Sequence, residues 1–136
     1  MADNTFVLQI IAPDRIFYEG EVKMVEMVTS EGEIGVLKDH IPMTNILKPG
    51  IINIIEEDVE KQAALHEGFV EILQEKVTVL AEIAEWPDEI DINRANEAKI
   101  RAERRLGQKE SGIDILRAET SLKKALIRIE LGNKEH

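Results

Sequence analysis

The chain has no cysteine among its 136 residues, which excludes disulfide bonds and thiolate metal sites and fits a reducing compartment. It has no apolar run near the roughly 18 residues that a membrane-spanning helix needs. Its start, MADNTFVLQ, has neither the cationic flank nor the apolar stretch of a secretory signal. These absences predict a soluble protein that reaches a membrane only through a partner.

Common catalytic motifs are missing as well. The sequence has no His-Glu-x-x-His, no Gly-x-Ser-x-Gly, no Walker lysine loop and no Gly-x-Gly-x-x-Gly. The three histidines, His40, His66 and His136, are far apart, and we interpret His40 as a loop residue because Ile41-Pro42 follows it. We therefore expect neither an enzyme, nor a metal site, nor a required cofactor.

Charge is distributed unevenly along the chain. Residues 1–86 carry 6 Lys/Arg and 17 Asp/Glu, a net charge of −11, whereas residues 87–136 carry 11 and 10, a net charge of +1. The acidic part argues against nucleic-acid binding, which needs a basic face. The contrast predicts two units with different neighbours, residues 1–86 and residues 87–136.

Residues 1–86 are predicted to form an antiparallel β-sandwich. Short segments rich in Val and Ile are separated by turn signals such as Pro13-Asp14, and no helical period competes with them. In residues 69–73 only Val70 and Ile72 share a buried face, whereas residues 5–11 carry apolar groups on both faces. Several strands without intervening helices favour a sandwich or a barrel. The expected strands are residues 5–11, 22–29, 51–55, 61–65, 69–73 and 77–82.

Residues 87–136 are predicted to form a C-terminal antiparallel two-helix hairpin, because no proline follows Pro87 and the connection between the helices is short. With the β-sandwich before it, the predicted fold class is α+β. Asp88 is the expected cap of the first helix, with Asp91 near its N-terminus. Gly107 is its expected end, and Gly132 is the expected end of the second helix. Ser111 and Asp114 resemble a capping box, with aspartate in place of Glu or Gln, and so predict the start of that second helix.

Alanine dominates the faces with which these helices are expected to meet. Small side chains bury little area, and at about 25 cal/mol per Å² they stabilise a seam less than leucine does. A helix pair of this size should therefore be marginal, and able to open or dock elsewhere. The seam residues are Ala95, Ala98, Ala102 and Leu106 in the first helix, and Ile115, Ala118, Leu122, Ala125 and Ile129 in the second.

One segment, SEGEIGVLKDHIP at residues 30–42, combines two glycines three residues apart with a His-x-Pro loop. It resembles the G-E-[LI]-G-x-[LM]-x-x-H-x-P signature of the epsilon subunit of bacterial F-type ATP synthases. IIAPDRIFYEG, GFVE and VTVLAE resemble further motifs of the family, so that the resemblance covers nearly the whole chain. Glu67 departs from it, because the family usually has glycine there.

The resemblance implies a non-catalytic rotor subunit of the central stalk, peripheral to the cytoplasmic face of the bacterial cell membrane. The sandwich would contact the gamma subunit and the c-ring in a complex that synthesises ATP at the expense of proton or sodium flow. The hairpin would extend into the alpha/beta catalytic head and inhibit ATP hydrolysis. The cationic residues of the hairpin that could contact the catalytic head are Arg94, Arg101, Arg104, Arg105, Lys123, Lys124 and Arg128. An alternative is a free-standing small-molecule sensor on a β-sandwich scaffold.

Residues 90–95, IDINRA, match the [IL]-D-x-x-R-A pattern that nucleotide-sensing members of the family carry at the start of the first tail helix. The resemblance implies an ATP site in which Asp91 accepts from the adenine amino group, Ile90 gives an apolar contact and four cations surround the triphosphate. Lys124 stands where the pattern has arginine, which predicts lower affinity because lysine lacks the bidentate fork. The alternative is an ordinary capped helix with solvated charges. The candidate residues are Glu85, Ile90, Asp91, Arg94, Ala95, Arg101, Lys124 and Arg128.

Overall fold

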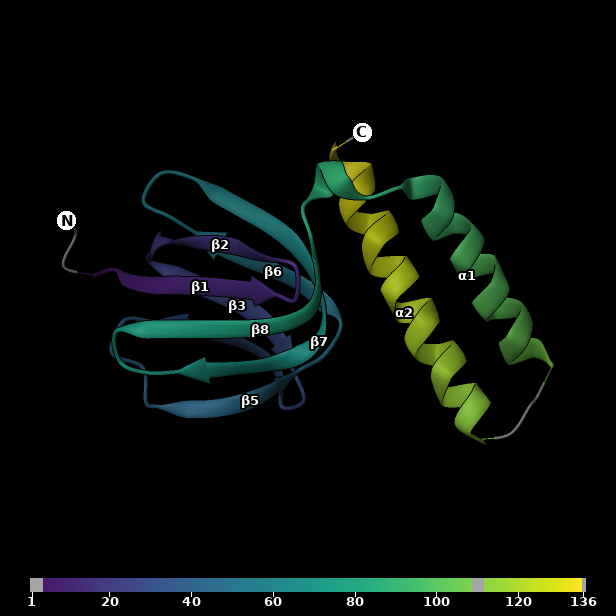
Figure 1. Ribbon diagram of the computed structural model, residues 1–136, viewed down its shortest axis with the longest axis horizontal. Coiled ribbons are helices and arrows are strands. Elements are labelled where there is room, and N and C mark those ends of the chain that lie inside the picture. Colours follow the sequence, from purple (N-terminus) through teal and green to yellow (C-terminus); the bar gives the residue numbers. More distant parts are fainter. Residues whose placement is uncertain (1–3, 109–111, 136) are drawn as a thin grey trace. The chain divides into compact units, whose positions relative to one another are not determined.

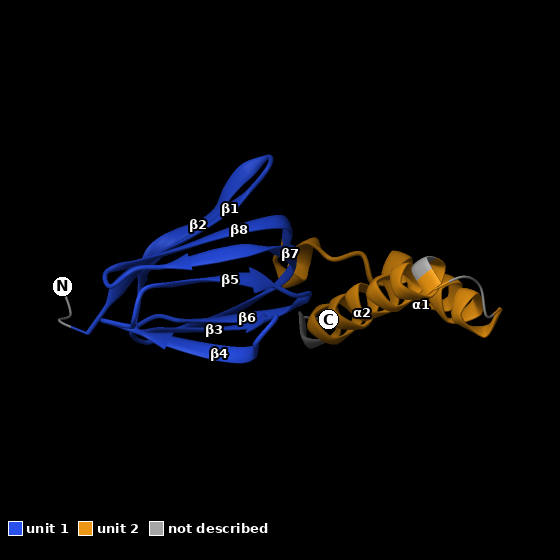
Figure 2. Ribbon diagram, turned by 90° about the horizontal axis from the view of Figure 1, so that it is seen from below, with its two compact units in different colours: residues 1–84 blue, residues 85–136 orange. Residues whose placement is uncertain are grey.

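The computed structural model describes residues 4–108 and 112–135, which form eight strands, one short 3₁₀ helix and two α-helices (Figure 1). The chain divides into two compact units, Met1–Ala84 and Glu85–His136 (Figure 2). Ser111 and His136 lie outside the described residues, as does most of the connection between the two α-helices. No helix among the described residues combines the length and the hydropathy that crossing a membrane requires.

The first unit is the predicted β-sandwich. Its strands are hydrogen-bonded in the order β2-β1-β8-β7-β5-β3-β4, and β6 pairs with both β3 and β7. This path folds over into two layers, with β2, β1, β8 and β5 in one and β6, β3 and β4 in the other (Figure 2). The strands are β1 (Phe6–Ala12), β2 (Arg15–Val22), β3 (Met24–Thr29), β4 (Gly32–Leu37), β5 (Met43–Leu47), β6 (Gly50–Ile55), β7 (Glu60–Ile72) and β8 (Lys76–Glu85).

The sandwich differs from its sequence-based prediction in three respects. Strands β2 and β5 were not expected, because their polar and apolar residues alternate too irregularly to give a clear period. The segments 61–65 and 69–73 belong to one strand, β7. Finally, β1 and β8 pair in parallel, although all the other pairs with a defined register are antiparallel.

Strand β7 joins the two layers by changing partner in its middle. It pairs with β6 up to Leu65 and with β5 from Gly68 onward. The residues at the change have left-handed backbones, with φ of 54° at Glu67 and 144° at Gly68. Glycine adopts such angles without steric cost, which explains the glycine that the family usually has at position 67. A side chain at position 68 would overlap the carbonyl oxygen of Leu80, so β7 and β8 approach closely there.

The core lies between the layers and follows the alternation of the strands. In β1 the side chains of Phe6, Leu8 and Ile10 are buried, and the opposite face is only half-covered. In β7, Val70 and Ile72 are fully buried while the face between them is exposed, which confirms the one-sided pattern expected there. The outer face of this layer is therefore at least partly exposed.

A polar contact links β2 to the loop after β6. The hydroxyl of Tyr18 donates a 2.5 Å hydrogen bond to Glu56, whose carboxylate also lies 3.4 Å from the ammonium of Lys61. A Cβ at Gly20 would lie 2.8 Å from the Tyr18 hydroxyl oxygen. Glycine at position 20 thus leaves room for the phenol, and this gives a physical reason for the Tyr-Glu-Gly sequence.

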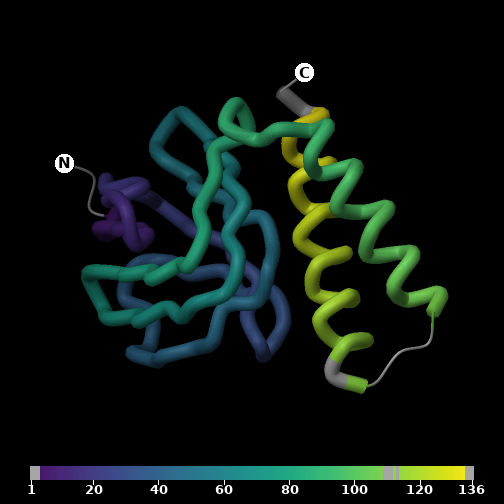
Figure 3. Tube along the Cα trace, turned by 45° about the vertical axis from the view of Figure 1, so that its right-hand side comes forward, coloured from purple at the N-terminus to yellow at the C-terminus, as the bar shows by residue number. Residues whose placement is uncertain are grey.

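The second unit is the predicted antiparallel hairpin, in which α1 (Ile92–Gly107) and α2 (Gly112–Glu135) run side by side after the 3₁₀ helix η1 (Pro87–Glu89) (Figures 1 and 3). Its seam is made mostly of alanine, with one leucine. The fully buried members are Ala95 and Ala102 in α1, and Ala118, Ala125 and Leu131 in α2.

The helix ends differ from expectation at two places. Asp91, not Asp88, caps α1, because its side chain accepts from the backbone N–H of Arg94. Helix α1 ends at Gly107 as predicted. Helix α2, in contrast, continues through Gly132 to Glu135, so the glycine is not a stop signal. A Cβ there would lie 2.9 Å from Ile92 Cγ1, so glycine allows α2 to approach the beginning of α1 closely.

Candidate functional site

A cavity of about 260 Å³ lies within the second unit, beside the capped start of α1. The end of β8, the 3₁₀ helix, α1 and α2 all contribute to it, so segments far apart in the sequence meet there. The short 3₁₀ helix begins at Pro87 and turns the chain toward α1. The lining residues are Glu85, Glu89, Asp91, Arg94, Ala95, Ala98, Arg101 and Arg128.

The structure brings together six of the eight residues that the sequence analysis proposed for an ATP site. Ile90 and Lys124 are not among the lining residues. Ile90 is buried, and the nearest side-chain atom of Ile90 lies 3.3 Å from where a Cβ of Gly132 would be. Glu89 and Ala98 line the cavity but were not proposed. Ala98 lies four residues after Arg94 on the same helix face, a spacing that identifies it in retrospect.

Each carboxylate of the cavity has a partner within the unit. Glu89 Oε1 accepts a 2.8 Å hydrogen bond from the backbone N–H of Trp86, closing the 3₁₀ helix. Asp91 Oδ1 accepts a 3.1 Å bond from the N–H of Arg94. Glu85 Oε1 accepts a 2.7 Å bond from Nε of Arg128, which lies 43 residues further along the chain. All three carboxylates thus contribute to local structure as well as to the charge of the cavity.

Three guanidinium groups face the same space. Arg94 and Arg101 are seven residues apart on α1, two turns along one face, and both are exposed. Arg128 comes from α2 and is partly buried, with 27% of its side chain exposed. Arginine presents planar sets of N–H donors that match carboxylate and phosphate groups. The arrangement therefore suits an anionic ligand that touches both helices.

The formal charge of this cavity is balanced, because three arginines oppose Glu85, Glu89 and Asp91. A polyanion would gain from the arginines but be repelled by the acids at close range. The geometry thus favours a ligand whose anionic end lies near the arginines and whose hydrogen-bond donors lie near Asp91. A purine nucleotide with an exocyclic amino group has this distribution of charge and donors.

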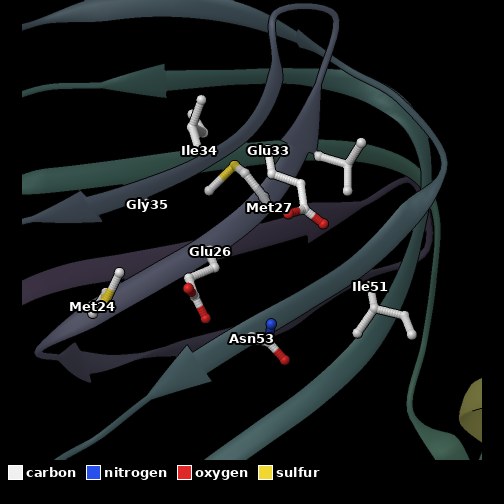
Figure 4. A pocket seen from close by; sticks show the side chains of 9 residues that line it. Met24, Glu26, Met27, Glu33, Ile34, Gly35, Ile51 and Asn53 are labelled. Atoms are coloured by element: carbon white, nitrogen blue, oxygen red, sulfur yellow. The ribbon is translucent and has the colours of Figure 1, made fainter.

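A second cavity, of about 290 Å³, lies on the outer face of the sandwich between β3, β4 and β6 (Figure 4). Its polar side chains are Glu26, Glu33 and Asn53, set among Met24, Ile34 and other apolar residues, and its lining contains no Lys or Arg. Two carboxylates without a cation disfavour nucleotide phosphates. Of these two cavities, the one between the helices is the better candidate for an anion.

Comparison with known proteins accounts for both units. The family model "ATP synthase, Delta/Epsilon chain, beta-sandwich domain" matches residues 5–87, and "ATP synthase, Delta/Epsilon chain, long alpha-helix domain" matches residues 88–131. A sandwich followed by long helices is therefore the architecture of a known class of ATP synthase subunit. The chain belongs to the ATP synthase delta/epsilon chain family.

Bacterial epsilon chains are among its relatives. The chain is 45% identical over 133 residues to the ATP synthase epsilon chain of Caldanaerobacter subterraneus subsp. tengcongensis, covering 97% of this chain and 96% of that protein. It is 42% identical over 131 residues to the epsilon chain of Halalkalibacterium halodurans, covering 96% and 98%. The family identified from the motifs is confirmed, and with it an accessory rather than catalytic role in ATP synthase.

The fold is also present in a solved structure. A chain in the cryo-EM structure of Euglena gracilis mitochondrial ATP synthase, OSCP/F1/c-ring in rotational state 1, has a TM-score of 0.81 and 23% sequence identity to this chain. The match covers 97% of this chain and 82% of that one. At this identity the likeness supports the fold alone, and the prediction of a sandwich followed by a helical hairpin is confirmed.

Proposed function

We propose that this chain works in the central stalk of an F-type ATP synthase at the cytoplasmic face of a bacterial cell membrane. Its sandwich contacts the gamma subunit and the c-ring during synthesis driven by protons or sodium ions. Its helical hairpin opens toward the alpha/beta catalytic head and inhibits hydrolysis, and ATP bound to the closed hairpin opposes that opening. Family membership supports the rotor role, and the arginine-lined cavity carries the regulatory part.

An exposed apolar row on the sandwich supports a protein partner there. Ile46 of β5 and Phe69 of β7 are direct partners in the sheet register, and they are 59% and 47% exposed. Leu80 and Ile11, which pair in register on the neighbouring strands β8 and β1, line an apolar hollow at the same face. Large apolar side chains gathered on one exposed face are typical of interaction sites. The gamma subunit is the partner that we assign to this face.

ATP would act on the hairpin by mass action. Its site includes Arg94 and Arg101 on α1 and Arg128 on α2, so only a closed hairpin offers all three. A ligand that binds one state stabilises it by RT ln(1 + [L]/Kd). The small-residue seam gives the closed state little other support, so binding shifts the equilibrium readily.

Calorimetry of the isolated chain with ATP, with and without magnesium, tests the site. Arg94→Ala should weaken binding at least about tenfold, since it removes a charge-assisted contact. Arg104→Ala is the matched control, because Arg104 is exposed on the same helix but does not line the cavity. Asp91→Asn keeps an N-cap acceptor while changing the group offered to adenine. Equal binding by the Arg94 and Arg104 variants, or no heat at millimolar ATP, would overturn the assignment.

Removal of residues 88–136 tests the regulatory role in the assembled complex. ATP synthesis should persist and ATP hydrolysis should rise, measured under conditions in which the intact complex is first found to be inhibited. Inhibition should also weaken with salt, because exposed charge pairs are screened over about 10 Å at 0.1 M ionic strength. Hydrolysis that stays inhibited in the shortened complex would contradict the proposal.

A further inference from the structure

Glu85 lines the site proposed for a polyanion although its carboxylate repels phosphate. Its contact with Arg128 offers an explanation. The 2.7 Å hydrogen bond reaches Nε of the guanidinium, and no other hydrogen bond or ion pair of Arg128 with a described residue is present. The terminal Nη1 and Nη2 groups therefore keep their four N–H donors. Both side chains line the cavity and are partly buried, 23% exposed for Glu85 and 27% for Arg128.

An arginine side chain has several rotatable bonds, and fixing it in one orientation costs conformational entropy. Arg128 lies on α2, whereas Glu85 lies at the end of β8, next to the 3₁₀ helix. A charged hydrogen bond between them fixes the plane of the guanidinium before any ligand arrives. Because the bond uses Nε, it leaves the two terminal nitrogens for bidentate contact with a phosphate group.

We propose that Glu85 is a positioning residue, which holds Arg128 through Nε so that its Nη1 and Nη2 face the phosphates of a bound nucleotide. This inference rests on the proposed ATP site. The two acidic residues then have different roles. Asp91 hydrogen-bonds to the ligand itself, whereas Glu85 hydrogen-bonds to Arg128, which binds the ligand. The carboxylate of Glu85 also offsets one of the three arginine charges, so its charge and its geometry act on the affinity for a polyanion in opposite directions.

Two substitutions separate these effects, because both remove the charge and only one keeps the acceptor. Glu85→Gln retains an oxygen that can accept from Nε, whereas Glu85→Ala does not. We expect the Kd for ATP of Glu85→Ala to exceed that of Glu85→Gln by at least about fivefold, the effect of losing one pre-organised charged contact. In an Arg128→Ala background the same pair of variants should differ by less than about twofold, since there is no guanidinium to orient. Circular dichroism of each variant checks that the helices are retained.

Calorimetry of the full chain gives the affinities, and ¹⁵N NMR of the arginine Nε–H groups gives a readout without ligand. The Arg128 Nε–H signal should be protected from solvent exchange in the wild-type chain and in Glu85→Gln, and lost in Glu85→Ala. Equal affinities of the two Glu85 variants, or a difference that persists without Arg128, would overturn the positioning role while leaving the site intact. Absence of ATP binding by the wild-type chain would instead remove the site, and this inference with it.

Discussion

At the scale of single residues, the backbone at Glu67 and Gly68 determines where β7 can change partner. Both residues have positive φ, and β7 leaves β6 and joins β5 at this point. This requirement for positive φ is local. The sequence pattern does not show it, because the pattern predicts separate strands at residues 61–65 and 69–73. Glu67 retains the left-handed conformation despite its side chain, at a cost of roughly 1–2 kcal/mol.

Gly68→Ala should destabilise the sandwich strongly, by about 3 kcal/mol or more, because the new methyl group meets the Leu80 backbone in a left-handed conformation. Glu67→Gly, one residue away, should have the opposite sign and stabilise by up to about 1 kcal/mol, since it relieves the same kind of strain. Urea denaturation of both variants measures the two free energies of unfolding. A neutral Gly68→Ala variant would mean that β7 and β8 can separate at no cost.

Tyr18→Phe should lower the free energy of unfolding by about 1 kcal/mol at pH 7, because it deletes the hydroxyl that donates to Glu56. Lys61→Gln is the control, and should change stability by less than about 0.5 kcal/mol since that ion pair is solvated. The measurement is urea denaturation followed by circular dichroism. An equal effect of both changes would show that the hydroxyl contributes no more than an exposed charge.

The same contact predicts a pH dependence. The hydrogen bond from Tyr18 holds the pKa of Glu56 below its ordinary value, so this stabilisation is present above about pH 4.3 and disappears as the pH falls through the lower folded pKa. Burial and the same hydrogen bond raise the pKa of Tyr18 above its ordinary value of about 10, so stability also declines at alkaline pH beyond that value. The wild-type advantage over Tyr18→Phe should therefore shrink near pH 3.

At the scale of elements, the helices show how far sequence patterns reach. Four alanines of the predicted seam, Ala95, Ala102, Ala118 and Ala125, are fully buried, because the spacing of three and four residues repeats regularly, whereas the buried Leu131 was not predicted. Gly107 and Gly132 look alike in sequence, yet only the first ends a helix. The reason is tertiary: Gly132 allows close approach to residues 90–92, a contact that local patterns do not contain. Asp91 was recognised in the motif, but its role as the actual cap was not.

Gly132→Leu should weaken the closed hairpin, because its side chain cannot fit where a Cβ already lies 2.9 Å from Ile92 Cγ1. We expect the helical signal to melt at a lower temperature and ATP affinity to fall. Gly107→Ala is the matched control: apart from its chain neighbours and the backbone of its own helix, no described atom lies within 4 Å of the new methyl group, and alanine favours the helix by up to about 1 kcal/mol. If Gly132→Leu melts at the wild-type temperature, α2 does not need to approach α1 at this residue.

At the scale of the whole molecule, the sequence contained enough information for the fold class and the family, because the motifs and the strand and helix patterns extend over long segments. It did not contain the parallel β1–β8 pair, since register between strands some seventy residues apart is fixed by the assembled sandwich. The candidate site was predicted as a set of residues. Which of them share a cavity depended on how η1 turns the chain before α1.

A fragment of residues 1–86 should fold alone and melt cooperatively, because the sandwich has its own buried core and Arg15 bonds the carbonyl of Ala84 within it. The fragment should also bind the gamma subunit, measured by size-exclusion chromatography against residues 87–136 as the control. An unfolded fragment would mean that the helices complete the core.

The parallel pairing of β1 with β8 has a consequence for folding on the ribosome. Val7 lies opposite Lys76 and Ile11 opposite Leu80. Strand β1, which is synthesised first, therefore cannot form this pairing until β8, the last strand, has been synthesised. Pairing over such a separation is entropically slow, whereas hairpins such as β3–β4 and β6–β7 can form as they emerge. Until β8 is synthesised, β1 and its hairpin partner β2 present an unpaired edge. Strand exchange between nascent chains is therefore the characteristic misassembly expected of this protein, and it ends when residues 76–85 become available.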